Sequence, residues 1–469
     1  MVRGHIDLPL TLDRSSPVPL TAQLADLLRE AMRTGGLRAG ERLPSSRGLA
    51  SVLGVSRTVV MVAYQQLYAE GWVDGRHGSG TYVADGVDHG GRTARRERRE
   101  RPGDRVRTGP ADRVIDMRPG RPWASAYDMA AWRRAWRAAG ALPPDDFPDP
   151  YGHPRLRELL AEHLRRARAV PVSVEDVMVT RGTGNGLDLI ATVLLRPRPG
   201  EPPPRAGVEE PGYRKARGIF AARGAEIVPC PVDDQGVIVE ALPDDLRVLY
   251  TTPAHQYPMG GRLPIPRRER LLAWARRTGA ILVEDDYDAE FRYDVAPLPA
   301  LYGLDPDRVV LLGSLSKSLS PDVGLGWLVA SGGLLDLIAK VREELTDRTP
   351  GPVQAAVATL LERGDLDRHL RRMRLEYARR RAIIVETLGP LGPVVRGDTA
   401  GLHVVIELPA EVVHRLVERA RRHGVLLDTV DRHHHGTPRV HGLVLGYGSA
   451  SQADVRHACT VIRRLLAAP

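Results

Sequence analysis

Short runs of consecutive apolar residues alternate with amphipathic segments over most of the chain. Four of these runs, at 177–180, 247–251, 280–284 and 308–313, are apolar at successive positions. Such continuity is typical of strands buried on both faces, whereas segments such as 267–279 have the apolar spacing of a helix. This succession predicts an α/β domain with a largely parallel sheet and helices on both of its faces.

A different pattern fills the chain up to about residue 84, where short helical segments follow one another. Leucines at helical spacing predict a first helix that begins near Leu20 and ends near Gly35. A second helix is expected after the sequence LPSS, in which Ser45 or Ser46 can cap its exposed amides, and a third after Ser56. Helix, tight turn and helix is the arrangement that places its second helix in the major groove of DNA.

Two short β segments, at 72–73 and 81–83, follow the third helix and enclose a glycine-rich turn. This pattern predicts a wing beside the helices. Polar and basic side chains at the helix starts and on the wing can contact phosphates or base edges. The residues predicted to contact DNA are Arg47, Ser56, Arg57, Thr58, Arg76, His77 and Gly78.

A polar stretch from 85 to 112 separates this region from the apolar runs. Between Gly90 and Arg107 it contains eight arginines, three acids and a single large apolar side chain. Such a segment cannot bury enough surface to fold alone, so it is expected to be a flexible, positively charged linker. The predicted domains are therefore residues 1–84 and 113–469.

The composition restricts the possible partners and location. A net charge of +9 permits binding to a polyanion such as DNA. No stretch approaches the roughly 20 apolar residues needed to cross a bilayer, so no membrane partner is expected. The two cysteines are too few for a disulfide framework, as is ordinary in a reducing compartment. A cytoplasmic protein is the prediction.

Lysine is rare in this chain, which makes its positions informative. All but three of the 67 basic residues are arginines, and Lys317 lies among serines directly after the run that ends at residue 313. A lysine amine held away from carboxylates can lose its proton and attack a carbonyl to form a Schiff base. Lys317 is therefore the candidate nucleophile, and a plain surface charge is the alternative interpretation.

Carboxylates follow the apolar run 280–284. Asp285, Asp286 and Tyr287 come at its carboxyl end, where α/β sheets bind ligands. One carboxylate next to a pyridine nitrogen keeps that ring protonated, as pyridoxal phosphate requires. Metal binding is the competing interpretation, but no histidine nearby in the sequence completes a ligand set, so no metal is expected.

A phosphate and a flat ring also have candidate partners. A strand, a glycine-rich turn containing Gly182 and Thr183, and a helix follow one another, so backbone amides can surround a phosphate there. Tyr213 follows a Pro-Gly turn and can stack on a cofactor ring, with ordinary core packing as the alternative.

Residues 17–84 resemble the winged helix-turn-helix domain of the GntR superfamily, with the LPSSR turn, the LGVSR turn and the glycine wing in the same order. Residues 113–469 resemble fold type I aminotransferases. The sequences VEEPGY, TPAHQYPMG, EDDYDAEF and SLSKSLSP, in that order, are similar to the MocR-type regulators. The resemblance implies a transcription regulator that binds double-stranded DNA and pyridoxal 5'-phosphate as a head-to-tail, domain-swapped homodimer.

The resemblance also assigns roles to single positions. Lys317 would be the Schiff-base lysine, Asp285 the partner of the pyridine nitrogen, Tyr287 the hydrogen bond to the ring oxygen and Tyr213 the stacking aromatic. The remaining contacts, to the phosphate and elsewhere on the cofactor, are expected from Gly182, Thr183, Ser314, Ser316 and His255.

The chain departs from the family pattern at two cofactor positions. Gly324 stands where the family generally has an arginine that contacts the phosphate, and Phe147 where it tends to have a tyrosine. Weaker cofactor binding is expected, unless Arg181 supplies the missing charge. Arg432 and Arg439 are both candidates to bind the carboxylate of an effector, and Arg432 is preferred. The histidines at 433–435 are expected to be loop residues rather than metal ligands.

Two functions share these residues. In the first, the aminotransferase-like domain senses pyridoxal phosphate, or its adduct with an amine or amino acid, and controls promoter binding. The alternative is a catalytically active aminotransferase with an accessory DNA-binding domain. The complete N-terminal DNA-binding pattern favours the regulator.

Overall fold

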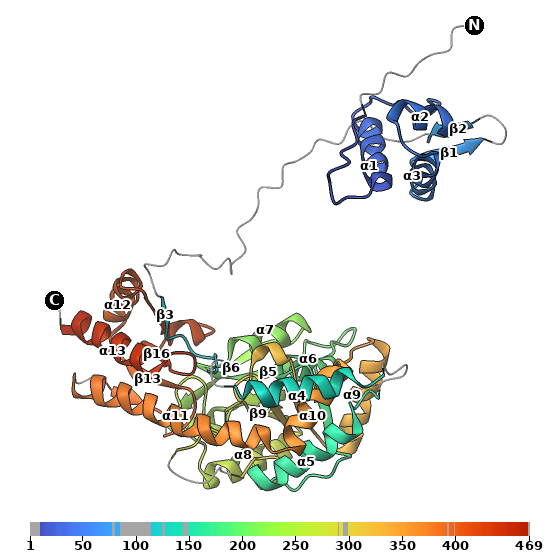
Figure 1. Cartoon of the computed structure of the whole chain (residues 1–469). Helices are drawn as coiled ribbons and strands as arrows, with labels where there is room; N and C mark the ends of the chain where they lie inside the picture. The colour runs from blue at the N-terminus through green and yellow to red at the C-terminus, as the bar shows by residue number, and fades with distance from the viewer. Residues whose placement is uncertain are drawn as a thin grey trace. The chain divides into compact units, whose positions relative to one another are not determined.

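The computed structural model describes residues 10–76, 80–84, 114–123, 127–143, 149–288, 290–293, 299–391, 394–397 and 399–467. Contacts divide the chain into two compact units, Met1–Arg107 and Thr108–Pro469, which are described one at a time (Figure 1). The expected linker at 85–112 lies outside the described residues. No helix in the described ranges is long and apolar enough to cross a membrane.

The first unit contains the elements that the sequence predicts. Three helices, α1 (Leu20–Arg33), α2 (Ser46–Leu53) and α3 (Arg57–Ala69), precede a two-stranded antiparallel wing of β1 (Val73–Arg76) and β2 (Gly80–Val83). The strands are longer than the predicted segments because the pairing continues to Arg76 and Gly80. The predicted winged helix-turn-helix is confirmed.

Local capping and one shared core explain these helices. The Ser45 hydroxyl accepts a hydrogen bond from the Gly48 amide at 3.1 Å, so Ser45 is the cap of α2. Ser56 caps α3 by accepting from the Val59 amide at 3.4 Å. The fully buried core side chains of this unit are Leu24, Ala25, Leu28, Met32, Leu37, Val60, Ala63, Leu67 and Val73.

The second unit is built around an eight-stranded sheet. In spatial order its strands are β4 (Val177–Thr180), β11 (Gly326–Val329), β10 (Val309–Ser314), β9 (Ile281–Asp286), β8 (Leu246–Thr251), β5 (Arg205–Glu210), β6 (Glu226–Asp233) and β7 (Gly236–Val237). The five central strands from β10 to β6 are parallel, whereas β11 and β7 are antiparallel to their neighbours. The four predicted strands are β4, β8, β9 and β10.

Helices cover both faces of this sheet, as predicted. Leu249 of β8 and Leu311 of β10 share one core with α5 (Pro154–Arg168), α8 (Ile265–Thr278) and α10 (Gly351–Glu362). The helix α4 (Met129–Gly140) packs against α10. The adjacent Tyr250 and Leu312 belong to a second core, with α6 (Thr183–Leu194), α7 (Arg214–Ala222) and α9 (Gly332–Glu344). Alternate strand side chains therefore point to opposite layers, which is why the runs are apolar at every position.

A second, smaller sheet lies near the C-terminus, and the sequence patterns did not predict it as a separate sheet. Its strands are β12 (Val394–Arg396), β13 (His403–Glu407), β16 (Gly442–Gly446) and β15 (Asp428–Thr429), with α11 (Asp365–Leu388), α12 (Ala410–Arg422) and α13 (Gln452–Ala467) beside them (Figure 1). In addition, β3 (Ile115–Asp116) pairs in parallel with β14 (Val425–Leu426). The start of the second unit is thereby tied to its end.

Replacing Gly313 by alanine tests the packing of β10. A β-carbon at this position would clash with the buried ring of Trp327 on β11, so Gly313→Ala is expected to cost about 1–3 kcal/mol of stability. The measurement is thermal unfolding of the full chain. Gly218→Ala in α7, where nothing lies within 4 Å, is the control and should stabilise by up to about 1 kcal/mol. Equal melting temperatures for the two variants would contradict this packing.

Candidate functional site

A cavity of about 830 Å³ lies at the carboxyl ends of β4, β9 and β10. It brings together residues that are far apart in the sequence. The sequence-predicted residues that line it are Arg181, Gly182, Thr183, Tyr213, Asp285, Tyr287, Ser314, Ser316, Lys317 and Arg432. His255 does not line the cavity and lies behind Tyr287.

Lys317 follows β10 and reaches back across the cavity. Its Nζ donates a hydrogen bond to the Gly120 carbonyl at 2.7 Å. Burial lowers the pKa of Lys317, while Asp288 and Asp285 act in the opposite direction. The expectation of a lysine away from carboxylates is therefore wrong, because β9 and the turn after it bring these acids close. The net lowering of the pKa still favours the neutral, nucleophilic amine.

Asp285 is fully enclosed near the end of β9. The Tyr250 hydroxyl donates to its Oδ2 at 2.7 Å. Burial raises the pKa of Asp285 to about 7, and the bond from Tyr250 only partly offsets this rise. Its second oxygen, Oδ1, is buried and has no hydrogen-bond partner within the described ranges. A buried oxygen of this kind calls for a hydrogen-bond donor, and the protonated nitrogen of a pyridine ring is a donor that fits.

The expected phosphate contacts surround the start of α6. Gly182 precedes this helix at φ +90° and provides no side chain to cap its amides. A β-carbon at the facing Gly326 would lie 2.7 Å from the Gly182 Cα, so close backbone packing requires glycine there. On the neighbouring strand Ser314 donates to the Ser316 hydroxyl at 2.9 Å. Free helix amides and two hydroxyls form a suitable cradle for an anion.

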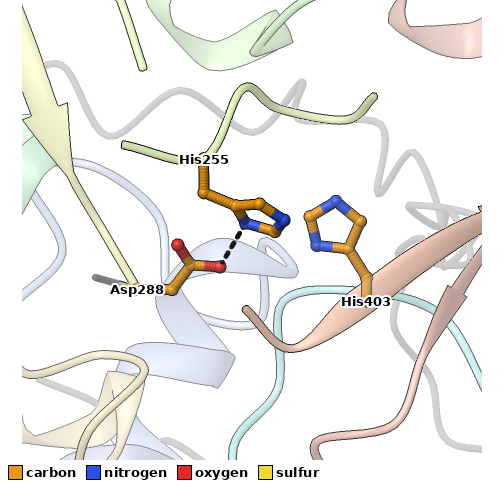
Figure 2. Close-up of side chains that lie close together, drawn as sticks. All are labelled: His255, Asp288 and His403. Carbon is orange, nitrogen blue, oxygen red and sulfur yellow. Dashed lines mark hydrogen bonds and ion pairs between the residues drawn. The ribbon is translucent and has the colours of Figure 1, made fainter. Parts of the chain in front are cut away.

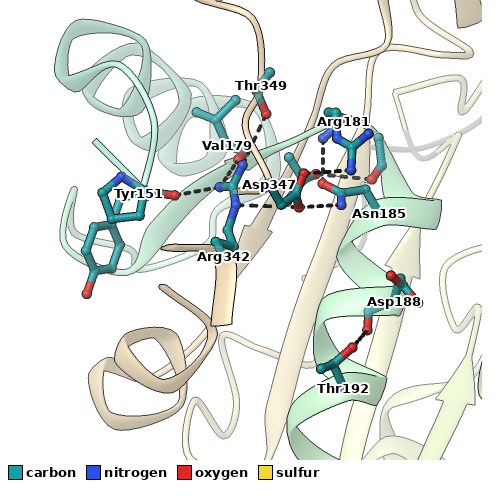
Figure 3. A network of polar contacts seen from close by, with 12 residues as sticks. Tyr151, Val179, Arg181, Asn185, Asp188, Thr192, Arg342, Asp347 and Thr349 are labelled. Atoms are coloured by element: carbon teal, nitrogen blue, oxygen red, sulfur yellow. Dashed lines mark hydrogen bonds and ion pairs between the residues drawn. The ribbon is translucent and has the colours of Figure 1, made fainter. Parts of the chain in front are cut away.

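Arg181 lies beside this cradle but already has a partner. Its Nη2 is 2.6 Å from Asp347 Oδ1, and Asn185 donates to the other Asp347 oxygen at 2.8 Å. Figure 3 shows these residues and the buried Arg342 gathered around Asp347, while the Tyr151 ring points away. About half of the Arg181 side chain is exposed, at 52%. A phosphate that it binds would therefore share the guanidinium, which has further N–H donors, with Asp347.

Gly324, the departure from the family pattern, follows the short helical turn Pro321–Val323. It has the left-handed conformation at φ +57°, and a β-carbon there would meet nothing within 4 Å. The space is thus open, and the backbone conformation disfavours a side chain. Phe147, the second departure, lies outside the described residues.

Tyr213 stands at the start of α7 between two other aromatic rings. Its ring lies 6.1 Å from that of Tyr250 in a stacked arrangement and 5.9 Å from that of Tyr257 edge to face. These neighbours limit its rotation and hold one aromatic surface at the cavity, because Tyr213 also lines it. The arrangement suits a ring that stacks on a flat cofactor.

A buried polar cluster supports Tyr287. His255 Nδ1 lies 3.0 Å from both the Tyr287 hydroxyl and Asp288 Oδ2. Figure 2 shows His403 beside His255 and Asp288. The atoms of these three side chains that could bind a metal lie within 4.8 Å of one another. The sequence interpretation considered only histidines near the acids in the sequence, whereas folding brings His255 from a distant loop and His403 from β13 next to Asp288.

Hydrogen bonds join several polar atoms of this cluster, whereas His255 Nε2 is buried and has no hydrogen-bond partner in the described ranges. His403 Nε2 lies 2.9 Å from the Pro258 carbonyl oxygen, which can only accept, so Nε2 carries the proton. Burial lowers the pKa of His403 to about 3, and its ring is neutral near pH 7. The backbone at Gly401 closes on the His255–Asp288 pair, because a β-carbon there would clash with both. The cluster holds the Tyr287 hydroxyl in place.

The C-terminal sheet contributes the far wall of the cavity. Arg432 lines it and forms an ion pair with Asp428 at 2.9 Å, whereas Arg439 is not among the lining residues. His433 is buried and also lines the cavity. It lies in the short turn Asp431–His433 between β15 and β16, so it is a residue of a connecting segment that also reaches the cavity.

Sequence reasoning missed several lining residues. Among them are Arg118, Gly120, Arg121, Arg214, Lys215, Tyr250, Tyr257, His403, Asp428 and His433. Arg214 and Lys215 directly follow Tyr213, and Tyr250 is a polar ring near the end of an apolar run, so these had local signals. His403 and Asp428 had none, since only tertiary folding brings the smaller sheet to the cavity.

The predicted DNA contacts lie on the first unit. Arg47, Ser56, Arg57 and Thr58 are all exposed at or near the starts of α2 and α3. Arg57 Nε donates to the Ser46 hydroxyl at 3.2 Å, which links the two helix starts. The backbone of Arg76 is in β1, but its side chain lies outside the described part, as do His77 and Gly78. Their roles stay predictions.

Comparison with known proteins gives two family matches and full-length relatives. Residues 20–83 match the bacterial regulatory proteins of the gntR family, and residues 130–441 match aminotransferase class I and II. The chain is 37% identical to the HTH-type pyridoxine biosynthesis transcriptional regulator PdxR of Corynebacterium glutamicum, over 96% of each chain. It is 33% identical to the probable rhizopine catabolism regulatory protein MocR of Rhizobium meliloti, over 97% of this chain and 95% of that one.

Solved structures confirm the predicted fold of the second unit. LysN, an α-aminoadipate aminotransferase of Thermus thermophilus complexed with N-(5'-phosphopyridoxyl)-L-leucine, matches with a TM-score of 0.68 and 26% identity, covering 76% of this chain and 92% of that chain. An archaeal alanine:glyoxylate aminotransferase has the same fold, with a TM-score of 0.69 and 24% identity, covering 76% and 91%.

The raised pKa of Asp285 predicts a pH dependence of stability in the cofactor-free protein. The folded state holds this proton more tightly than the unfolded chain, so the contribution of Asp285 is complete below about pH 4 and is lost as the pH rises through about 7. Asp285→Asn should reduce that loss by about 3–4 kcal/mol, the energy of a difference of about three pKa units. Urea unfolding between pH 4.5 and 8 measures it.

The control for this experiment is Asp307→Asn, because Asp307 is exposed. Its stability should follow the wild-type pH curve throughout. Parallel curves for wild type and Asp285→Asn would show that burial does not hold a proton on Asp285.

Proposed function

Since the chain belongs to the MocR-type helix-turn-helix transcription regulators, we propose that its aminotransferase-like domain binds pyridoxal phosphate and thereby controls promoter binding. The chain is a DNA-binding regulator with both parts of that family. The observation that carries the cofactor proposal is the buried Asp285, whose Oδ1 has no partner in the described part of the chain. A protonated pyridine nitrogen supplies the missing donor.

The remaining lining residues fit the other parts of the same cofactor. The Lys317 amine, with its lowered pKa, suits capture of the aldehyde group. Tyr213 offers a ring for stacking, and Tyr287 a hydroxyl held by His255. The phosphate cradle consists of Gly182, Thr183, Ser314 and Ser316. Bound pyridoxal phosphate supplies an electrophilic aldehyde and an electron-accepting ring.

The effector is either pyridoxal phosphate itself or its adduct with an amine or amino acid. Relatives of this chain are named for pyridoxine biosynthesis and for rhizopine catabolism, and each name favours a different effector. Arg432 is the proposed partner of an effector carboxylate, which then competes with Asp428 for the guanidinium. An active aminotransferase with the same residues is the second candidate, supported by the shared fold.

Regulation further requires two states that differ in affinity for the ligand. We propose that the chain forms a domain-swapped homodimer, as the family resemblance implies. This dimer presents two winged helices to DNA and alternates between two states that differ in their affinity for the ligand. A protein that binds promoters acts where the chromosome is, so the proposed location is the cytoplasm.

Lys317→Ala tests the cofactor site. Borohydride reduction in the presence of pyridoxal phosphate should add the cofactor's mass to the peptide that contains residue 317 in the wild type, as measured by mass spectrometry. The variant Lys340→Ala removes an exposed lysine on α9 and should label like the wild type. Unlabelled wild-type protein, or equal labelling of a Lys317→Ala preparation, would refute the assignment.

The same variants test control of DNA binding. The full chain is titrated with duplex from its own upstream region, with and without pyridoxal phosphate. The affinity of the wild type and of Lys340→Ala should change with the cofactor, and that of Lys317→Ala should not. Multiple-turnover transamination at ordinary enzyme rates, about 1 to 10³ per second, would instead support the second candidate.

Arg181→Ala tests whether this arginine replaces the charge missing at Gly324. A charge-assisted hydrogen bond to phosphate typically contributes about 1.5–3 kcal/mol, so the variant should bind pyridoxal phosphate at least about tenfold more weakly. Equilibrium titration by absorbance measures the affinity. Arg348→Ala removes an exposed arginine next to Asp347 and is the control. Unchanged affinity in Arg181→Ala would end the compensation hypothesis.

A further inference from the structure

The helix α3 has two faces of opposite character. Val60, Ala63, Tyr64 and Leu67 are buried in the core of the first unit. Four other residues each lie two positions before one of these buried residues, and all four are exposed: Thr58, Met61, Val62 and Gln65. Two residues correspond to about 200° around a helix. The second set therefore forms a strip opposite the core, which we call the outer strip of α3.

The centre of the outer strip is apolar although it faces solvent. The side chains of Met61 and Val62 are 42% and 41% exposed. No acidic residue occurs in α3, and Arg57 at its start is its only charged residue. The outer strip therefore carries no negative charge that would repel a polyanion. At its centre it presents apolar side chains instead of charged ones.

The major groove offers a specific partner for such side chains. The C5-methyl of thymine is the apolar group that a base pair presents there, and apolar side chains contact it. A Gln side chain can bind adenine through N6 and N7. Since adenine and thymine share a base pair, Met61, Val62 and Gln65 all favour A·T pairs.

We propose that Met61 and Val62 read thymine methyl groups, and Gln65 an adjacent adenine, in the operator half-site. The inference rests on the proposed function, in which α3 is the second helix of the helix-turn-helix and enters the major groove. Arg47 and Arg57 lie exposed near the helix starts, where they can contact the flanking phosphates. Charge complementarity at this end of α3 favours DNA as the occupant over a second protein.

The inference specifies the change that removing a methyl group should cause. Full-length protein first selects its preferred duplex from a random-sequence library, and single thymines are then replaced by deoxyuridine, which lacks only the methyl. At one or more positions the affinity should fall about fourfold per methyl group, the value of one buried methyl or methylene. The selected half-site should contain A·T pairs at these positions.

Variants connect those positions to the outer strip. Met61→Ala and Val62→Ala should each weaken binding to the thymine duplex by a similar factor. In each variant, replacing the thymine that the lost side chain contacts by deoxyuridine should then not weaken the affinity further. Met61→Leu keeps an apolar side chain and should retain the methyl preference. Val52→Ala removes an apolar side chain that is 74% exposed on α2, and as the control it should leave both affinities unchanged.

The outcomes separate this inference from the proposed function. Equal binding of thymine and deoxyuridine duplexes at every position overturns the methyl readout and leaves DNA binding intact. If Met61→Ala loses the same affinity for the thymine and the deoxyuridine duplex, the methyl readout is also overturned. Self-association that depends on Met61 would assign the outer strip to a second copy of the chain. Failure to select any duplex removes the proposed function together with the inference.

Discussion

The burial of Asp285 is the constraint on which the rest of the cavity depends. A carboxylate removed from water without full hydrogen bonding costs several kcal/mol, and Tyr250 satisfies only one of its oxygens. Asp285 pairs in register with Leu312 of β10, so Ser314 at the end of β10, and Ser316 and Lys317 after it, emerge at the same edge of the sheet. The order of the parallel strands therefore places an acid, an amine and hydroxyl groups around one cavity.

Closing the cavity requires parts of the chain that lie far from these strands. The Gly120 carbonyl accepts from Lys317, and β3, just before it, is held by pairing with β14 of the C-terminal part. His403 at the start of β13 and Arg432 after β15 complete the wall. The C-terminal sheet is consequently a part of the site, and its position relative to the large sheet sets how the cavity is shaped.

The sequence predicted those features that depend on near neighbours. Runs such as 308–313 are apolar at every position because alternate side chains enter two different cores, and Ser56 caps α3 through an amide three residues away. Pairings across long sequence distances had no local signal. Tyr250 beside Asp285, and Asp347 beside Arg181, are separated by 35 and 166 positions, and only the strand order and the loop after α9 bring them together.

Two ion pairs at the cavity, one between distant positions and one between positions four residues apart, bear on the proposed sensing of a ligand. Arg181 and Arg432 both line it, and each is already paired with an acid, Asp347 and Asp428. An anion that binds either arginine competes with the resident carboxylate, so part of its binding energy is lost. That loss has a structural consequence, because Asp347 also holds Asn185 on α6. A change of partner at Arg181 therefore alters the contacts of the loop after α9, and where those contacts differ between two states of the protein the anion shifts the equilibrium between them.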